Sequence, residues 1–250
     1  MIDRGTLARM AGLQGIKPWQ QEKHYIQSAI LVSLSEEPLV MKGGTYLWLF
    51  HGLDRFSEDL DFTCEGEIAE GIMQKTSDAL AMLGIENSVK AITDDERSFS
   101  FRVSAKGPLN TSAIDLCHVY VEISRRERVL KPTLGLRMEF DAYSLPVKII
   151  GGMSLDEVAA EKVRALLTRK KARDAYDLFF LISKKKAAFD RSMVEEKLEY
   201  YGIGFSESAF LEKLGEKEKI WDAELKPMVF GELPPFAKAS EAIRKWVGIR

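Results

Sequence analysis

Two aspartates separated by one residue are the first feature of the sequence that could do chemistry. Asp59 and Asp61 lie in the run Asp59-Leu60-Asp61-Phe62, whose apolar residues predict a short strand. Side chains two residues apart in a strand point to the same face, so the two carboxylates would stand together. Like charges this close repel unless a cation lies between them, and oxygen ligands favour Mg²⁺ or Mn²⁺ over zinc. The pair therefore predicts a divalent-metal site.

A pair of glycines precedes these aspartates. Gly43 and Gly44 follow residues 39–41, which predict a buried strand, and Thr45 is expected to cap a helix that begins at Tyr46. Such a strand, turn and helix N-terminus form an anion cradle, because free backbone N–H groups and the helix dipole favour negative charge. The spacing of a Walker loop is absent. A phosphate cradle near a metal-binding aspartate pair is typical of phosphoryl or nucleotidyl transfer.

Hydrophobic periodicity predicts the elements that must position these residues. In the first half of the chain, strands are expected at residues 39–41, 60–62, 99–103, 114–123 and 145–150, and helices at residues 46–51 and 66–83. An earlier helix is expected to follow Lys17-Pro18 and to be stopped by Glu36-Glu37-Pro38. The residues up to 16 are polar and are expected to form an arm.

The second half is helical in pattern. Ser154 and Glu157 form a capping box, which predicts helices at residues 155–169 and 173–182, and the remainder is expected to be helical, with Trp221 and Trp246 in its core. We therefore predict an α/β (α+β) fold: a mixed sheet with flanking helices at residues 1–150, then a helical domain at residues 151–250.

Composition narrows the class of protein. The chain has 250 residues, of which 46% are hydrophobic and 30% charged, and a net charge of −2. This balance is that of a globular protein and excludes a wholly basic protein that coats nucleic acid. Two cysteines exclude a disulfide framework and predict reduced thiols in the cytoplasm. Neither a secretory signal nor a membrane-spanning stretch is expected.

The charges are unevenly distributed. Residues 54–70 carry seven acids and one base, whereas residues 162–191 carry ten bases and three acids. Such blocks indicate either a cation and a polyanion used together or two solvated faces. The run Lys184-Lys185-Lys186 likewise has two interpretations, a cationic end to a helix or a contact with an RNA backbone.

Residues 42–62 resemble the nucleotidyltransferase (polymerase-β-like) superfamily, whose signature is Gly-Ser, a spacer and Asp-x-Asp. Gly44-Thr45 fills the first slot and 13 residues separate it from Asp59. Lys-Gly-Gly-Thr-x-Leu from Lys42 and Arg-Phe-Ser-x-Asp-Leu-Asp-Phe from Arg55 resemble AbiEii-type toxins of abortive-infection and toxin–antitoxin systems. A second block, from Glu161-Lys162 to Asp177-Leu178, agrees, so the resemblance covers about residues 40–180.

The resemblance implies roles for particular residues. Asp59 and Asp61 would bind the metal, and Lys162 with one following aspartate would be catalytic. The nucleotide would be bound by residues of both blocks, namely Lys42, Gly43, Gly44, Thr45, Arg55, Ser57, Arg169 and Arg173.

The third metal-binding carboxylate is either Asp115 or Glu122. If residues 114–123 are one strand, Asp115 shares its face with apolar residues, whereas Glu122 shares the more polar face with His118 and Tyr120. This parity favours Glu122, which would complete the metal site and deprotonate the attacking hydroxyl.

The choice between Asp174 and Asp177 depends on helix geometry. Lys162, Arg169 and Arg173 are spaced by 7 and 4 residues, so a continuous helix would place them on one face, where they could reach a triphosphate. On the same helix, Asp177 would lie closer to the face of Lys162 than Asp174 does. The alternative is an internal ion pair between Arg173 and Asp177.

The expected function is a Mg²⁺-dependent nucleotidyltransferase that moves a nucleoside monophosphate from an NTP to an acceptor hydroxyl. The resemblance implies an RNA acceptor, tRNA 3′ ends in particular, or a protein side chain, and a toxin with an antitoxin encoded nearby. The alternatives are an NTP-binding module without transfer, a phosphotransferase and a helical interaction protein.

Overall fold

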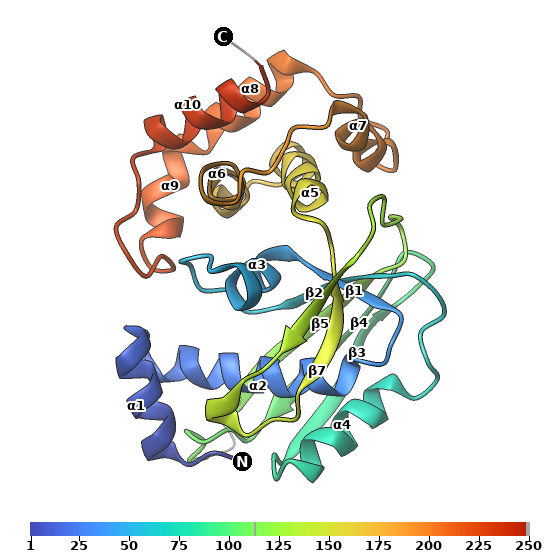
Figure 1. Ribbon diagram of the computed structural model, residues 1–250, viewed down its shortest axis with the longest axis vertical. Coiled ribbons are helices and arrows are strands. Elements are labelled where there is room, and N and C mark those ends of the chain that lie inside the picture. The colour runs from blue at the N-terminus through green and yellow to red at the C-terminus, as the bar shows by residue number, and fades with distance from the viewer. Residues whose placement is uncertain (113, 249–250) are drawn as a thin grey trace. The chain divides into compact units, whose positions relative to one another are not determined.

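The computed structural model describes residues 1–112 and 114–248 and divides into two compact units. The first unit comprises residues Met1–Phe50, Ser57–Val129 and Thr133–Gly152. The second comprises His51–Phe56, Leu130–Pro132 and the chain from Met153 onward, so three separate segments build each unit. Figure 1 shows the order of the elements by colour from the N-terminus to the C-terminus.

A seven-stranded mixed sheet forms the frame of the first unit, with the strand order β3-β4-β5-β2-β1-β7-β6. Strand β1 pairs in parallel with β7, and β2 pairs in parallel with β5, whereas all other neighbours are antiparallel. The strands are β1 (Leu39–Lys42), β2 (Leu60–Cys64), β3 (Asn87–Asp94), β4 (Ser98–Ala105), β5 (Cys117–Ser124), β6 (Leu134–Met138) and β7 (Lys148–Gly152).

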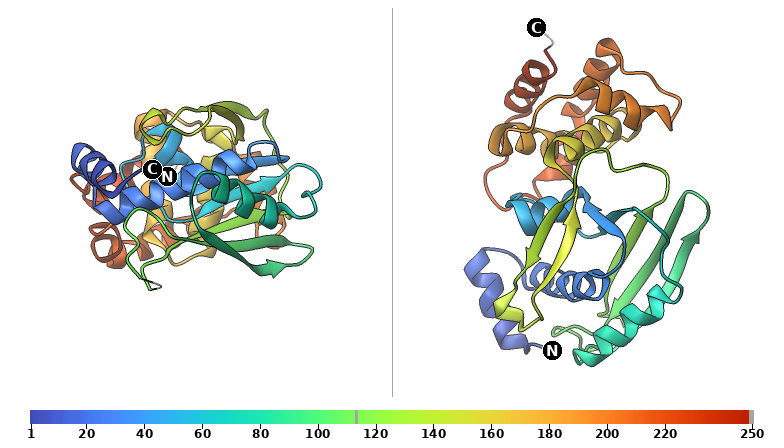
Figure 2. Two further views of the ribbon diagram at one scale, coloured as in Figure 1. Left: turned by 90° about the horizontal axis from the view of Figure 1, so that it is seen from below. Right: turned by 45° about the vertical axis from the view of Figure 1, so that its right-hand side comes forward.

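Two long helices cover one face of this sheet. Helix α2 packs against β5 and against α4, which in turn packs against β3 (Figure 2). Pro18 stands at the start of α2, where its fixed φ suits a helix and its missing N–H removes no bond. The helices of the unit are α1 (Arg4–Gln14), α2 (Pro18–Leu34), α3 (Gly43–His51) and α4 (Ile72–Met82), with a short 3₁₀ turn at Asp141–Tyr143.

The central strands alternate between an apolar and a polar face. Val119, Val121 and Ile123 of β5 are fully buried, whereas Tyr120 and Glu122 between them are exposed. This period of two fixes the register, because a shift by one residue would turn the valines to solvent.

The second unit consists of six helices among the described residues: α5 (Leu155–Thr168), α6 (Ala172–Lys185), α7 (Arg191–Glu199), α8 (Glu207–Glu216), α9 (Glu218–Leu225) and α10 (Phe236–Trp246). Helix α6 packs against α5, α9 and α10. Ser154 caps α5 by accepting from the Glu157 amide, which is one half of the capping box predicted from the sequence, whereas the Glu157 carboxylate accepts from the Leu130 and Lys131 amides. Trp221 is buried as expected, whereas Trp246 is only half-buried. No helix of the described chain is long and apolar enough to cross a bilayer.

Hydrogen bonds explain why two short segments belong to the helical unit. The Phe56 amide donates to the Met228 carbonyl, and the Phe230 amide donates to the Asp54 carbonyl. Farther along the chain, the Leu130 and Lys131 amides donate to the buried carboxylate of Glu157.

Several sequence-based expectations about the elements were wrong. The expected N-terminal arm is the helix α1, which Asp3 caps by accepting from the Thr6 amide and which Gly15 ends in a left-handed conformation. Helix α3 begins at Gly43, so Thr45 lies inside it and is not its cap. The helix expected from residue 66 begins only at Ile72. Strands β3 and β6 were not predicted.

Candidate active site

The Asp-x-Asp segment and the third carboxylate meet in the middle of the sheet. Asp61 of β2 lies directly opposite Lys42 of β1 on one side and Glu122 of β5 on the other. Residues opposite one another in adjacent strands point to the same face and stand about 5 Å apart. Leu60 and Phe62 point to the other face and are fully buried. The sheet therefore brings two of the three expected carboxylates side by side.

The first aspartate of the pair is tied to helix α3. Asp59 lies one residue before β2, and its carbonyl accepts a hydrogen bond of 2.5 Å from the Thr45 hydroxyl. Thr45 is fully buried, so this bond is shielded from water. The hydroxyl expected as a helix cap thus holds the Asp-x-Asp segment against the start of α3.

Only glycine fits at the start of this helix. Gly43 has a φ of 78°, in the left-handed region that other residues rarely adopt. A Cβ built on it would lie 2.2 Å from Oδ2 of Asp61, far inside van der Waals contact. The Asp61 carboxylate therefore lies directly against the helix N-terminus, where the dipole favours a negative charge.

The other expected nucleotide contacts near this site have partners within the protein. Lys42 is nearly buried and pairs with Glu127 at 2.9 Å. The Ser57 carbonyl accepts from the Gln27 side chain at 3.2 Å, and Ser57 is buried. Gly44 is buried within α3.

The two candidates for the third carboxylate occupy different surroundings. Asp115 is exposed, lies before β5 begins and accepts from the hydroxyls of Thr111 and Ser112 at 2.5 and 2.9 Å. These hydrogen bonds hold the pKa of Asp115 below its ordinary value. Glu122 lies in the strand beside Asp61, so of the two it is the one that the fold brings to the Asp-x-Asp segment.

The donor set suits a hard divalent cation, but its side chains are not gathered into a finished site. Asp61 and Glu122 offer oxygen ligands on adjacent strands, which is the chemistry that Mg²⁺ prefers. Within residues 1–112 and 114–248, no three His, Cys, Asp or Glu side chains are grouped closely enough to hold a metal ion.

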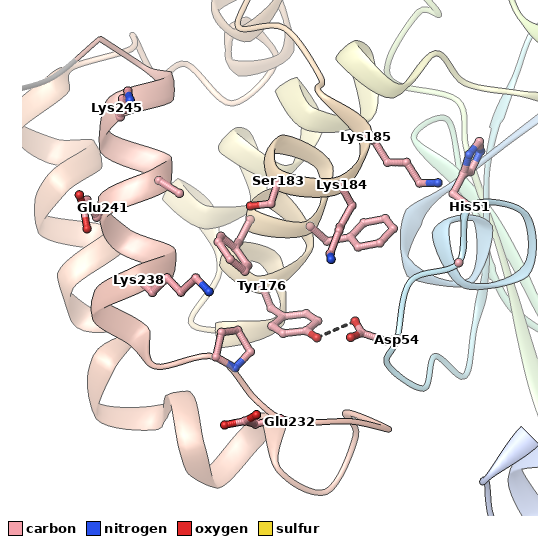
Figure 3. Close-up of a pocket in the computed structure, with 15 residues that line it drawn as sticks. His51, Asp54, Tyr176, Ser183, Lys184, Lys185, Glu232, Lys238, Glu241 and Lys245 are labelled. Atoms are coloured by element: carbon pink, nitrogen blue, oxygen red, sulfur yellow. Dashed lines mark hydrogen bonds between the residues drawn. The ribbon is translucent and has the colours of Figure 1, made fainter.

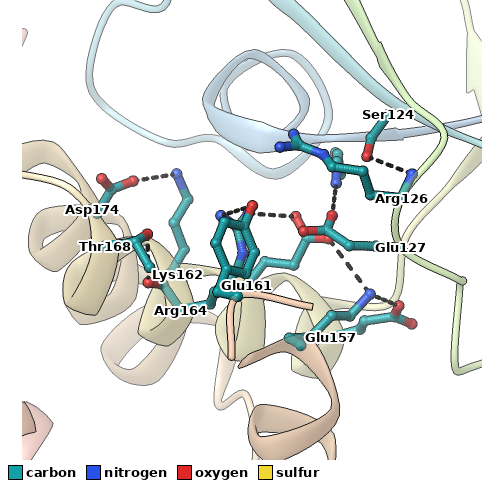
Figure 4. Close-up of polar contacts among 12 residues, drawn as sticks. Ser124, Arg126, Glu127, Glu157, Glu161, Lys162, Arg164, Thr168 and Asp174 are labelled. Carbon is teal, nitrogen blue, oxygen red and sulfur yellow. Dashed lines mark hydrogen bonds and ion pairs between the residues drawn. The ribbon is translucent and has the colours of Figure 1, made fainter. Parts of the chain in front are cut away.

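The catalytic residues expected in the second sequence block form a buried ionic cluster within the helical unit. The Lys162 ammonium lies 3.2 Å from Asp174 and 2.6 Å from Asp177. Figure 4 shows the contact that Lys162 of α5 makes with Asp174 of α6. All three side chains are buried or nearly so. Both aspartates contact the lysine, and Asp177 is the closer.

Arg55 completes this cluster from a distant part of the chain. Its guanidinium donates to both oxygens of Asp177 at 2.6 Å and is 1% exposed, while Asp177 is fully buried. Burial alone would raise the pKa of Asp177, but the charges of Arg55 and Lys162 hold that pKa below its ordinary value. Arg55 was expected to contact the nucleotide, and it could do so only if this pair opened.

Two expectations about the basic residues were wrong. Helix α5 ends at Thr168 and α6 begins at Ala172, so Lys162, Arg169 and Arg173 do not lie on one continuous helix. Arg169 is an exposed residue with extended backbone just after α5. The alternative pairing of Arg173 with Asp177 is also wrong, because the partners of Asp177 are Arg55 and Lys162.

The sequence did not reveal a cavity in the helical unit. Tyr176 of α6 lines it and donates a hydrogen bond of 2.6 Å to Asp54 (Figure 3). The only sequence signal was the run of lysines 184–186 at the end of α6, two of which line the cavity.

Comparisons with solved structures show a shared fold. MenT4, described as a nucleotidyltransferase toxin from Mycobacterium tuberculosis, has a TM-score of 0.65 at 21% identity over 98% of this chain and 88% of its own. The protein JHP933 from Helicobacter pylori has a TM-score of 0.60 at 20% identity over 92% of this chain and 90% of its own. No curated protein matches the chain in sequence.

The family follows from the sequence match. The profile described as nucleotidyl transferase AbiEii toxin, type IV toxin–antitoxin system, matches residues 26–246. The chain belongs to this family and is a nucleotidyltransferase toxin. The resemblance noted in the sequence is thereby confirmed, as is the mixed α/β fold.

Proposed function

We propose that this toxin transfers a nucleoside monophosphate from an NTP to an acceptor hydroxyl, with Mg²⁺ bound by Asp59, Asp61 and Glu122. The observation that carries the proposal is the pairing of Asp61 with Glu122 across adjacent strands, next to Gly43, where a Cβ would clash with the Asp61 carboxylate. Paired carboxylates beside a helix N-terminus are suited to holding a cation and a phosphate together.

Each residue then has a defined task. The N-terminus of α3, at Gly43, Gly44 and Thr45, would hold the phosphates through its backbone N–H groups. Glu122 would accept the proton of the attacking hydroxyl, whose oxygen bonds to the α-phosphorus as the bond to the departing pyrophosphate breaks. Bound Mg²⁺ would supply positive charge to the phosphate oxygens. The roles expected of Lys162, Asp174, Asp177, Arg169 and Arg173 on the nucleotide stay predictions.

The acceptor that we propose is RNA, in particular a tRNA 3′ end, in keeping with the family resemblance. An antitoxin encoded nearby would relieve the toxicity, as the type IV toxin–antitoxin family implies. Both cysteines are free thiols, which fits a protein that acts in the reducing cytoplasm.

The test is label transfer. Purified protein is incubated with total RNA, Mg²⁺ and each α-³²P NTP in turn, alongside Asp61→Asn, Glu122→Gln and the control Asp115→Asn. We expect a labelled RNA band with the wild type and the control, and a loss of at least about a hundredfold in the other two variants.

Three outcomes would contradict parts of the proposal. Absence of label on RNA and protein from a folded sample would indicate a nucleotide-binding module. Transfer only from γ-³²P NTP would indicate a phosphotransferase. Full activity of Glu122→Gln together with loss of activity in Asp115→Asn would show that Asp115, and not Glu122, is the third metal-binding carboxylate.

A further inference from the structure

The helical unit contains a cavity of about 850 Å³ between α6 and α10, within the ~300–1,000 Å³ range of small-molecule sites. Its apolar wall is formed by Tyr176, Phe179 and Phe180 of α6, with Pro234 from the segment before α10. It shares no residue with the carboxylate site on the sheet. Neither the fold nor the family match assigns it a ligand.

Positive charge converges on this wall. Four exposed lysines line the cavity, two at the end of α6 and two on α10, and none of them forms an ion pair with another residue of the described chain. They are Lys184, Lys185, Lys238 and Lys245. Figure 3 shows the Lys184 and Lys238 ammonium groups directed from different helices toward the space around Tyr176. An anionic group in this space would be attracted by both.

The acidic side chains of the cavity do not cancel these charges. Asp54 accepts a hydrogen bond from the Tyr176 hydroxyl at 2.6 Å, and Glu241 points away from Lys184 toward the outer side of α10 (Figure 3). Glu232 lies at the opposite end of the cavity from the lysines of α6. Asp54 and Glu232 thus provide acceptors for amino groups, separate from the cationic part.

This combination selects one kind of ligand. A simple anion would gain nothing from an aromatic wall, and an apolar ligand would gain nothing from unpaired lysines. A nucleotide has a planar base with amino groups and an anionic phosphate, and bases stack on aromatic side chains. We propose that the cavity binds one nucleotide unit, with its base against Phe179 and its phosphate between Lys184 and Lys238.

The nucleotide could come from two sources, a free nucleotide or a nucleotide within single-stranded RNA. The probe is a fluorescein-labelled strand of ten adenylates, measured by fluorescence anisotropy in EDTA, so that metal-dependent binding elsewhere is suppressed. The test variant is Lys184→Glu/Lys238→Glu. The matched control, Lys90→Glu/Lys219→Glu, changes the same charge at two exposed lysines outside the cavity.

We expect the test variant to raise the Kd at least about tenfold and to lower the slope of log K against log salt by about 0.7, for the one phosphate that the two lysines would neutralise. The control is expected to change the Kd less than about threefold. Phe179→Leu is expected to weaken binding with an unchanged salt slope, because stacking carries no charge.

Competition then identifies the source. Displacement of the probe by AMP assigns the cavity to free nucleotides, whereas displacement by unlabelled strand alone assigns it to RNA. Wild-type affinity in the test variant, or an equal loss in test and control variants, would overturn the proposal. Because no NTP is present, failure of the transfer reaction would not affect this result.

Discussion

Replacing Asp177 with Asn tests whether the buried ionic cluster is a principal source of stability in the helical unit. The carboxylate is fully buried and accepts from two guanidinium nitrogens of Arg55 and from Lys162, all at 2.6 Å. An amide of the same shape removes the negative charge and turns a donor toward the surrounding cations. In the variant, Lys162 still has an ion-pair partner, Asp174 at 3.2 Å. The Arg55 guanidinium, in contrast, retains only its hydrogen bond of 2.9 Å to the Phe56 carbonyl.

The magnitude follows from this arrangement. Removing one partner of a buried ion pair leaves an uncompensated charge and costs about 3–5 kcal/mol. The matched control is Asp222→Asn in α9, where the carboxylate pairs with Lys226 at 2.7 Å and both side chains are about two-thirds exposed. An exposed pair of this spacing contributes at most about 0.5 kcal/mol.

The assay is urea denaturation followed by tryptophan fluorescence and circular dichroism. Trp221 is buried in the helical unit with its ring centre 6.0 Å from that of Tyr176, so its emission reports on this unit. We expect a much lower midpoint for Asp177→Asn than for Asp222→Asn, and partial recovery in Arg55→Met/Asp177→Leu, which removes both charges. Equal midpoints for the two single variants would refute the reasoning.

Two further predictions concern the first unit. Gly43→Ala is expected to abolish label transfer and to destabilise the protein more than Gly52→Ala. Both glycines have a left-handed φ, but only a Cβ at Gly43 would clash with Asp61. Equal losses of stability in urea melts of the two variants would contradict this. Burial lowers the pKa of His24 to about 4, so the unfolded chain binds a proton that the folded chain does not. Stability should therefore fall by up to about 3 kcal/mol between pH 6.5 and 4, and His24→Phe should flatten that slope in melts across the range.

The central strands could be predicted from the sequence because their apolar residues form the core of the first unit and recur at every second position. In β2 and β5 the large apolar residues alternate with polar ones, and the structure buries the apolar face, as for Phe62 and Val121. Strands β3 and β6 lie at the two edges of the sheet, where little of the strand is buried and no alternation develops. Helix α1 was missed because its polar composition was taken as that of an arm. Its sequence does contain a helix cap, Asp3, and a helix-ending glycine, Gly15.

The candidate site was predictable where its residues are close in sequence or paired across the sheet. The Asp-x-Asp segment and the glycines stand in one stretch, and strand parity was enough to favour Glu122. The ion pair of Arg55 with Asp177 joins residues 122 positions apart, and no local pattern specifies such a contact. The cavity on α6 likewise depends on how α10 returns to pack beside it.

The helical unit is discontinuous in the chain, and this has a consequence for how such proteins arise and can be engineered. A gene fragment that begins at Met153 would lack Arg55 and would leave Asp177 with one cationic partner fewer in its interior. It would also lack the Leu130 and Lys131 amides that satisfy the buried carboxylate of Glu157. The unit is therefore not a portable module: a cut at Gly152 would separate segments that satisfy one another's buried charges.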